Sequence, residues 1–237
     1  MVSFSHQARQ HGDLFLPISR SNEGLSDDLI YLGSAIEQID ELLQYCSLTS
    51  DSSILDFECG QGRFANGLLA HAITIKNYCG IDTDLESIKW CECWIQRWHP
   101  NFAFIHVPAF NARYNPTAAP QQPLPVEVHS FNIAFINSVF SHMLTSDVEF
   151  YLTQLHNALR DNGTIYMTAF IEPDVPEVEE NPENYLSKTS TGPLHRVRYE
   201  QSFFCRLVEH AGFTIMAFKH RGIERTQQSV IIAKRLA

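Results

Sequence analysis

The chain has 237 residues, of which 44% are hydrophobic, and carries a formal net charge of −10 at pH 7. Its length fits one α/β domain with insertions, and its hydrophobic content excludes disorder over most of the chain. The negative charge argues against a general nucleic-acid or anionic-membrane surface, and no apolar run approaches the roughly 20 residues that span a bilayer. The six cysteines lack framework spacing and the N-terminus has no apolar signal segment, so we expect reduced thiols in a cytoplasmic protein.

The N-terminal part is predicted to be an irregular, polar extension followed by one helix. The helix is expected to begin at Ser26, the N-cap, and to run to about Cys46. Acidic residues follow the cap, and leucine and isoleucine recur at helical spacing. We therefore assign residues 1–50 to an N-terminal extension and a leading helix that packs on a sheet.

A short apolar run then leads into a turn that contains two glycines. The run Ile54–Leu55 precedes Asp56, the turn reads Cys59-Gly60-Gln61-Gly62, and a helix-compatible stretch extends from Arg63 to Ala72. Strand, glycine turn and helix are typical of the first unit of a nucleotide-binding α/β domain, in which backbone N–H groups face the ligand. The spacing matches neither the dinucleotide fingerprint nor a P-loop.

The second predicted strand, Thr74–Asp82, ends in an acidic residue about 20 residues beyond the glycine turn. A carboxylate there suits the two hydroxyl groups of a ribose, and the alternative is a cap for the next helix, Leu85–Trp98. We assign Asp82 to the ligand and Asp84 to the cap.

The remaining elements continue the alternation of strands and helices. A third strand, Phe102–Val107, leads into a Pro-rich connection to about Glu127, whose length indicates a functional or mobile segment. The apolar strand Ser130–Asn137 follows, and ligands in open parallel sheets lie at the carboxyl end of such a strand. A helix capped by Ser146, Ser146–Arg160, leads into a strand, Thr164–Ile171. An insertion follows, Glu172–Arg198, and then a helix, Glu200–His210. The chain ends with two strands, Phe213–His220 and Ser229–Lys234. This order predicts a mostly parallel sheet with an antiparallel edge hairpin.

The glycine turn is similar to the first motif of class I S-adenosylmethionine (SAM)-dependent methyltransferases, an acidic residue, x, Gly, x, Gly, x, Gly. The corresponding residues run from Asp56 to Gly62, with Glu58 in place of the first glycine. Further segments that match the family in order and spacing are Tyr78–Asp82, Phe131–Ile136, Val139–Met143 and Leu155–Gly163. Val139–Met143 and Gly33 resemble a bacterial subgroup that acts on small molecules or sugars.

This resemblance implies a Rossmann-like fold with a mostly parallel seven-stranded sheet, an antiparallel C-terminal edge hairpin and helices on both faces. Residues 51–237 would form a single domain with insertions at about 110–127 and 172–198. SAM would lie over the strand ends. Its methionine would be lined by Asp56, Glu58, Cys59, Gly60 and Gly62, its ribose by Asp82 and Thr83, its adenine by Pro108, Ala109 and Phe110, and its sulfonium by Asn137 and Ser138.

Two of these positions depart from the family pattern. The carboxylate of Glu58 is expected to repel the methionine carboxylate of SAM, or to pair with its ammonium group or with Arg63. Related proteins often carry an acidic residue in place of Pro108, and proline cannot accept a hydrogen bond from the adenine amino group through its side chain.

Methyl transfer from a sulfonium depends on positioning and on exclusion of water, and a hydroxyl acceptor also benefits from a general base. His142 is the first candidate because it follows the central strand at the ligand edge and histidine titrates near neutrality. Its alternative role is a packing or helix-capping histidine. His195 in the insertion is the second candidate, with a solvated loop residue as its alternative.

The leading hypothesis is a SAM-dependent methyltransferase that modifies a small-molecule or sugar acceptor, with oxygen as the expected acceptor atom. We expect no metal, because Cys91-x-Cys93 has no further ligands nearby, and no nucleic-acid or membrane partner. The alternative is a catalytically degenerate methyltransferase fold that serves as a binding or scaffold subunit, which Glu58 and Pro108 motivate. A nicotinamide oxidoreductase is disfavoured by the glycine spacing.

Overall fold

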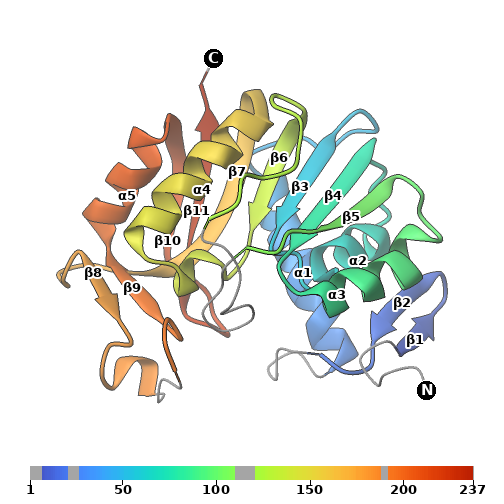
Figure 1. Cartoon of the computed structure of the whole chain (residues 1–237), viewed down its shortest axis with the longest axis horizontal. Coiled ribbons are helices and arrows are strands. Elements are labelled where there is room, and N and C mark those ends of the chain that lie inside the picture. The colour runs from blue at the N-terminus through green and yellow to red at the C-terminus, as the bar shows by residue number, and fades with distance from the viewer. Residues whose placement is uncertain (1–6, 21–26, 110–120, 188–191, 237) are drawn as a thin grey trace. The chain divides into compact units, whose positions relative to one another are not determined.

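The computed structural model describes residues 7–20, 27–109, 121–187 and 192–236. The chain divides into two compact units, Met1–Val107 and Pro108–Ala237. Figure 1 colours the first unit blue to green and the second yellow to red. No helix among the described residues is long and apolar enough to cross a membrane.

The first unit opens with a β-hairpin, where the sequence predicted an irregular extension. Strands β1 (Ala8–His11) and β2 (Leu14–Pro17) pair antiparallel, and Gly12 in the connecting turn has a φ of 60°. The ring of Phe15 stacks on that of Trp98 with centroids 5.7 Å apart. The hairpin forms because glycine allows the left-handed turn and aromatic packing buries one face of the ribbon.

Helix α1 (Asp28–Leu43) follows, and its N-cap is Asp27, whose carboxylate accepts hydrogen bonds from the backbone N–H groups of Leu29 and Ile30. The predicted cap, Ser26, lies outside the described residues. Helix α1 packs on α2 (Arg63–Ala70). A Cβ atom at Gly67 of α2 would lie 2.6 Å from the Cβ of Ala35, so glycine is what permits this close approach.

Strands β3 (Ser53–Phe57), β4 (Asn77–Asp82) and β5 (Phe102–His106) form the parallel sheet of the first unit, in the order β3-β4-β5. Their carboxyl ends therefore share one edge. Helix α3 (Leu85–Cys91) follows β4 and is capped by Asp84, as predicted. The regular helix does not continue to Trp98, because a π-helical turn, Glu92–Gln96, replaces its second half.

The second unit contains four long strands, β6 (Phe131–Ile136), β7 (Leu159–Glu172), β10 (Phe213–Ile223) and β11 (Gln228–Arg235). Strand β7 is parallel to β6 and antiparallel to β11, and β11 is antiparallel to β10. The predicted mostly parallel sheet with antiparallel strands at the C-terminal edge is confirmed. Helices α4 (Thr145–Ala158) and α5 (Gln201–His210) pack on each other beside these strands (Figure 1).

Two expectations for α4 were wrong. Its N-cap is Leu144, which offers no side-chain acceptor, and Ser146 lies inside the first turn. Met143 alone separates the 3₁₀ turn Phe140–His142 from this cap, so the N-cap lies two residues earlier than predicted. The helix ends at Ala158 rather than Arg160, because β7 already begins at Leu159.

The predicted insertion 172–198 is partly built onto the sheet. It contains β8 (Val178–Glu180) and a 3₁₀ turn (Tyr185–Ser187), and it leads into β9 (Val197–Glu200), which pairs with both β8 and β7. Residues 188–191 of this insertion, and 110–120 of the other predicted insertion, lie outside the described residues.

Candidate active site

The turn after β3 is built from residues with left-handed backbone conformations. Glu58, Gly60 and Gly62 have φ angles of 60°, 53° and 68°. The N–H of Cys59 donates to the carbonyl of Ile81 in β4 at 3.0 Å, and the N–H of Gly62 donates back to the Cys59 carbonyl at 3.1 Å. The turn is thereby fixed to the carboxyl end of the neighbouring parallel strand.

The two glycines of the turn serve different purposes. A Cβ atom at Gly62 would lie 2.5 Å from Cδ1 of Ile95 and 3.2 Å from Sγ of Cys91, so packing beneath the turn requires glycine. A Cβ at Gly60 would meet no atom within 4 Å, so this residue borders open space. Gly62 is also the N-cap of α2 and provides no side-chain acceptor for its first N–H groups.

Asp82, at the end of β4, joins the turn to the next helix. Its Oδ2 accepts from the N–H of Gly60 at 2.6 Å and its Oδ1 from the N–H of Asp84 at 2.7 Å. Burial raises the pKa of Asp82 to about 6. Each carboxylate oxygen has a second lone pair, so the group retains acceptor capacity for a ligand.

The side chain of Glu58 turns toward the end of β4. The hydroxyl of Thr83 donates to its Oε2 at 3.2 Å. Burial, and then the like charge of Asp82, raise the pKa of the Glu58 carboxyl well above its ordinary value. The guanidinium of Arg63 instead donates to the hydroxyl of Ser34 at 3.3 Å and to the amide oxygen of Gln38 at 2.5 Å. The structure thus brings Glu58 together with Asp82 and Thr83.

Asp56 is 3% exposed within β3 and accepts a hydrogen bond from the hydroxyl of Tyr78 in β4. Burial raises the pKa of Asp56 to about 7. Sequence reasoning missed this partner, because Tyr78 sits in an apolar strand pattern where an aromatic residue is expected for packing alone.

In the second unit, a hydrogen-bond network holds the turn after β6. Ser138 has a φ of 62°, and its N–H donates to the hydroxyl of Thr168 at 2.7 Å. That hydroxyl donates to Oε1 of Gln228 at 2.7 Å, and Nε2 of Gln228 donates to the hydroxyl of Ser138 at 2.8 Å. The hydroxyl of Ser141 lies 3.4 Å from that of Ser138. We call these four residues the Gln228 network, and it fixes a strained turn at a strand end.

His142 ends the 3₁₀ turn that follows Ser138, and its Nδ1 lies 3.1 Å from the carbonyl oxygen of Leu194. A carbonyl oxygen only accepts, so this contact assigns the proton to Nδ1 and leaves the lone pair of the neutral ring on Nε2. The structure therefore places His142 beside the Leu194–His195 segment of the insertion. His195 itself is half-buried.

The other predicted cofactor residues are spread along the second unit. Pro108 is exposed, Ala109 is 3% exposed, and Asn137 is half-buried directly after β6. Phe110 lies outside the described residues. Within the described parts of the chain, no group of three or more His, Cys, Asp or Glu side chains is arranged to hold a metal ion.

The described strands and the glycine turn after the first parallel strand form a Rossmann-like methyltransferase fold. The chain belongs to the methyltransferase domain family, whose model matches residues 31–217. It is an enzyme of this class, and its cofactor is SAM.

Solved structures support the fold. A SAM-dependent methyltransferase from Methanosarcina mazei is 18% identical, with a TM-score of 0.59 and coverage of 83% of this chain and 97% of that one. The 1,6-didemethyltoxoflavin-N1-methyltransferase of Burkholderia thailandensis is also 18% identical, with a TM-score of 0.59 and coverage of 89% and 80%. The [4+2]-cyclase SpnF is 14% identical, with a TM-score of 0.60 and coverage of 92% and 86%. Proteins named for different reactions thus share this fold.

Proposed function

We propose that this methyltransferase transfers the methyl group of SAM to a hydroxyl group of a small molecule or sugar. The observation that carries the proposal is the 2.6 Å hydrogen bond from Gly60 to Asp82, which joins the glycine turn and the acidic strand end into one constellation. The N1-methyltransferase that the chain resembles was crystallised with 1,6-didemethyltoxoflavin and S-adenosylhomocysteine bound, and this supports a small acceptor.

The residues of the turn fit the cofactor. The space beside Gly60 admits a ligand close to the backbone, and the start of α2 after Gly62 favours a carboxylate such as that of the methionine. Asp82 retains acceptor capacity for the ribose hydroxyl groups, with Thr83 beside it. When bound, SAM supplies a methyl group activated by its sulfonium. The roles assigned by resemblance to Asp56, Cys59, Pro108, Ala109, Phe110, Asn137 and Ser138 are part of this proposal.

His142 is proposed as the general base. SAM held by the glycine turn and Asp82 would supply the methyl group to the acceptor oxygen, and His142 would accept the proton that the hydroxyl group loses. The contact between Nδ1 and Leu194 supports this role, because it orients the ring and sets the required tautomer. His195 follows the orienting residue directly and is retained as the second candidate.

A binding or scaffold subunit is the second candidate function. One observation favours it, namely that Glu58 puts a second carboxyl group beside Asp82 and Thr83. Two neighbouring acids could hinder the cofactor through bulk and through charge.

The first test is isothermal titration of the full chain with SAM and with S-adenosylhomocysteine. Micromolar binding supports an active cofactor site, whereas no binding at millimolar ligand would favour the scaffold function. Phenols, free sugars and primary amines then serve as acceptor probes, with S-adenosylhomocysteine formation as the readout. Turnover of amines alone would contradict the oxygen acceptor.

The base is tested with His142→Ala, for which we expect kcat to fall about 10²- to 10⁴-fold with the Kd for SAM unchanged. His210→Ala, at the exposed end of α5, is the matched control. A rate that matches the unchanged protein would remove His142 from the mechanism, and the same test on His195 would follow.

A further inference from the structure

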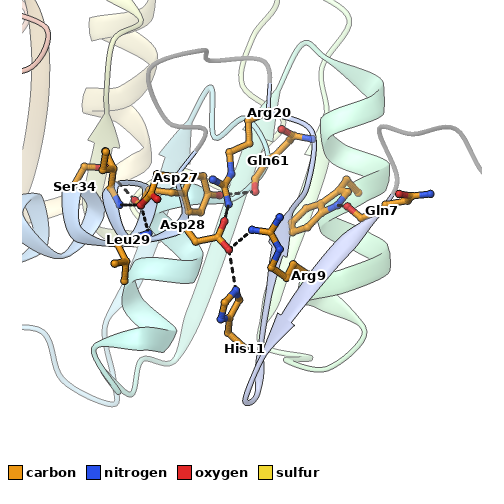
Figure 2. A network of polar contacts seen from close by, with 12 residues as sticks. Gln7, Arg9, His11, Arg20, Asp27, Asp28, Leu29, Ser34 and Gln61 are labelled. Carbon is orange, nitrogen blue, oxygen red and sulfur yellow. Dashed lines mark hydrogen bonds and ion pairs between the residues drawn. The ribbon is translucent and has the colours of Figure 1, made fainter.

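We propose that Tyr31 is a positioning residue for the cofactor turn, and that the N-terminal segment, residues 7–20, controls cofactor affinity through it. The inference rests on the assignment of the turn at residues 58–62 to SAM. All the groups involved lie in the first unit, and Figure 2 shows most of them.

Tyr31 holds one peptide group of the turn. It lies in the first turn of α1, is 3% exposed, and its hydroxyl donates to the carbonyl of Gln61 at 3.1 Å. The N–H of the same peptide group, at Gly62, donates to the carbonyl of Cys59 at 3.1 Å. Both ends of this peptide group are therefore fixed, so its plane cannot rotate without breaking a hydrogen bond. Burial raises the pKa of Tyr31, which keeps the hydroxyl a donor.

Arg20 stacks over the ring of Tyr31. Its guanidinium carbon lies 4.2 Å from the ring centroid, and its side chain is 5% exposed. A guanidinium stacked on an aromatic face in a buried position is a favourable and oriented contact. Arg20, the last residue of the N-terminal segment, thus restricts the movement of the Tyr31 ring.

Asp28, the first residue of α1, fixes Arg20 and the hairpin together. Its Oδ1 accepts from Arg20, while its Oδ2 accepts from Arg9 at 2.5 Å and pairs with Nε2 of His11 at 2.8 Å. We call this group the Asp28 clamp, and Figure 2 shows the carboxylate between the three side chains. Partial burial raises the pKa of Asp28, but the hydrogen bonds from Arg9, Arg20 and His11 outweigh it and lower the pKa to about 2.

The chain of contacts therefore runs from the hairpin through Asp28 and Arg20 to Tyr31, and from Tyr31 to the carbonyl of Gln61. A turn that is preorganised binds its ligand without an ordering cost, so loosening this chain of contacts weakens SAM binding. Loss of one net hydrogen bond corresponds to roughly a fivefold change in affinity.

The test compares the full-length protein with Tyr31→Phe, Asp28→Asn and the double variant by titration with SAM. We expect the Kd to rise about three- to tenfold in each single variant and less than additively in the double variant, because both act on one chain of contacts. The KM for SAM should rise in parallel, while kcat at saturating SAM and the KM for the acceptor stay unchanged.

Two matched controls separate this effect from general destabilisation. Asp40→Asn removes another aspartate–histidine pair of α1, the one with His71 at 2.9 Å, and Tyr45→Phe removes a tyrosine hydroxyl beyond the far end of α1. Both should bind SAM as the unchanged protein does. Arg20→Lys retains a charge for Asp28 but loses the planar stack, and should weaken SAM binding without unfolding the hairpin.

Hydrogen exchange of the ligand-free protein provides a second readout, since Tyr31→Phe should accelerate exchange in residues 57–67. If the unchanged protein binds SAM and all variants bind it equally, this inference is overturned while the proposed function stands. If the unchanged protein does not bind SAM, both are overturned.

Discussion

Glu58 stands at the position of the glycine turn where the methyltransferase motif has its first glycine. It takes a left-handed backbone conformation that favours glycine, with a φ of 60°, and its carboxyl lies beside Thr83 and Asp82. A side chain in this conformation costs of order 1 kcal/mol, and the like charge of a neighbouring carboxylate adds to that cost. Gly60, two residues further along the turn, borders open space.

Glu58→Gly is expected to raise the affinity for SAM, by about tenfold, because it removes bulk and charge from the proposed ribose side of the site. Calorimetric titration measures the change. Ala72→Gly is the matched control, since Ala72 also has a positive φ, 56°, but lies outside the site. An affinity that stays equal or falls in Glu58→Gly would contradict the hypothesis that Glu58 impairs the site.

Asp56 gives the first unit a pH-dependent stability. Burial raises its pKa in the folded state to about 7, above the ordinary value of 3.8, so the folded state holds a proton that the unfolded state releases. This contribution is fully present below about pH 4 and is lost as the pH rises through about 7. The raised pKa values of Glu58 and Asp82 act with the same sign.

Asp56→Asn should therefore flatten the fall in unfolding free energy between pH 4 and pH 8, because an amide retains an acceptor for Tyr78 but does not titrate. The difference in unfolding free energy between pH 4 and pH 8 should become smaller by about 1–4 kcal/mol. Urea denaturation at several pH values measures it. Asp51→Asn on the exposed surface is the control. An identical pH profile in Asp56→Asn would show that another group carries the dependence.

At the scale of elements, the last strand supports the turn that follows β6. Gln228, at the start of β11, reaches Ser138 and Thr168, which lie 90 and 60 residues away in sequence. Thr168 and Ser141 are fully buried and Gln228 is 3% exposed, so the network has few competing water partners.

Gln228→Leu should lower the unfolding free energy by about 2–4 kcal/mol, because the buried hydroxyl of Thr168 and the half-buried hydroxyl of Ser138 lose their hydrogen bonds to the amide. It should also lower kcat, since the turn leads directly to His142. Gln227→Leu is the matched control, because the side chain of Gln227 donates to the local carbonyl of Glu224 at 2.6 Å. Equal stability of the two variants would contradict a structural role for the network.

The insertion is an element whose described part is anchored to the sheet. Glu172, at the end of β7, accepts from the hydroxyl of Tyr185 at 2.7 Å, pairs with His220 at 2.7 Å, and pairs with Arg221 at 2.9 Å. These contacts join the insertion to β10. The anchored segment also carries Leu194, which orients His142.

For the whole molecule, the family assignment makes a direct prediction about ligand-linked stability. SAM at 100 times its Kd should stabilise the folded chain by about 2.7 kcal/mol. For a chain of this size that corresponds to roughly 5–10 °C in Tm. NADH at the same concentration should leave Tm unchanged, and differential scanning calorimetry measures both. A shift with NADH alone would revive the oxidoreductase hypothesis.

Sequence by itself determined the class of fold and the main features of the glycine turn. The strand–turn–helix pattern at Asp56–Gly62, the acidic end of the second strand and the antiparallel final strands are all local signals, readable from periodicity and spacing. Asp84 was identified as a cap in the same way, because capping depends on residues within one turn of the helix start.

Tertiary structure alone decided which distant groups meet. The pairs Tyr78–Asp56, Gln228–Ser138 and Tyr31–Gln61 join residues that are 22, 90 and 30 positions apart. The N-terminal hairpin was missed because its stability comes from aromatic packing and from the Asp28 clamp rather than from its own short strands. Hydrogen-bond partners of this kind depend on how strands and helices pack in space, and sequence spacing carries no record of that packing.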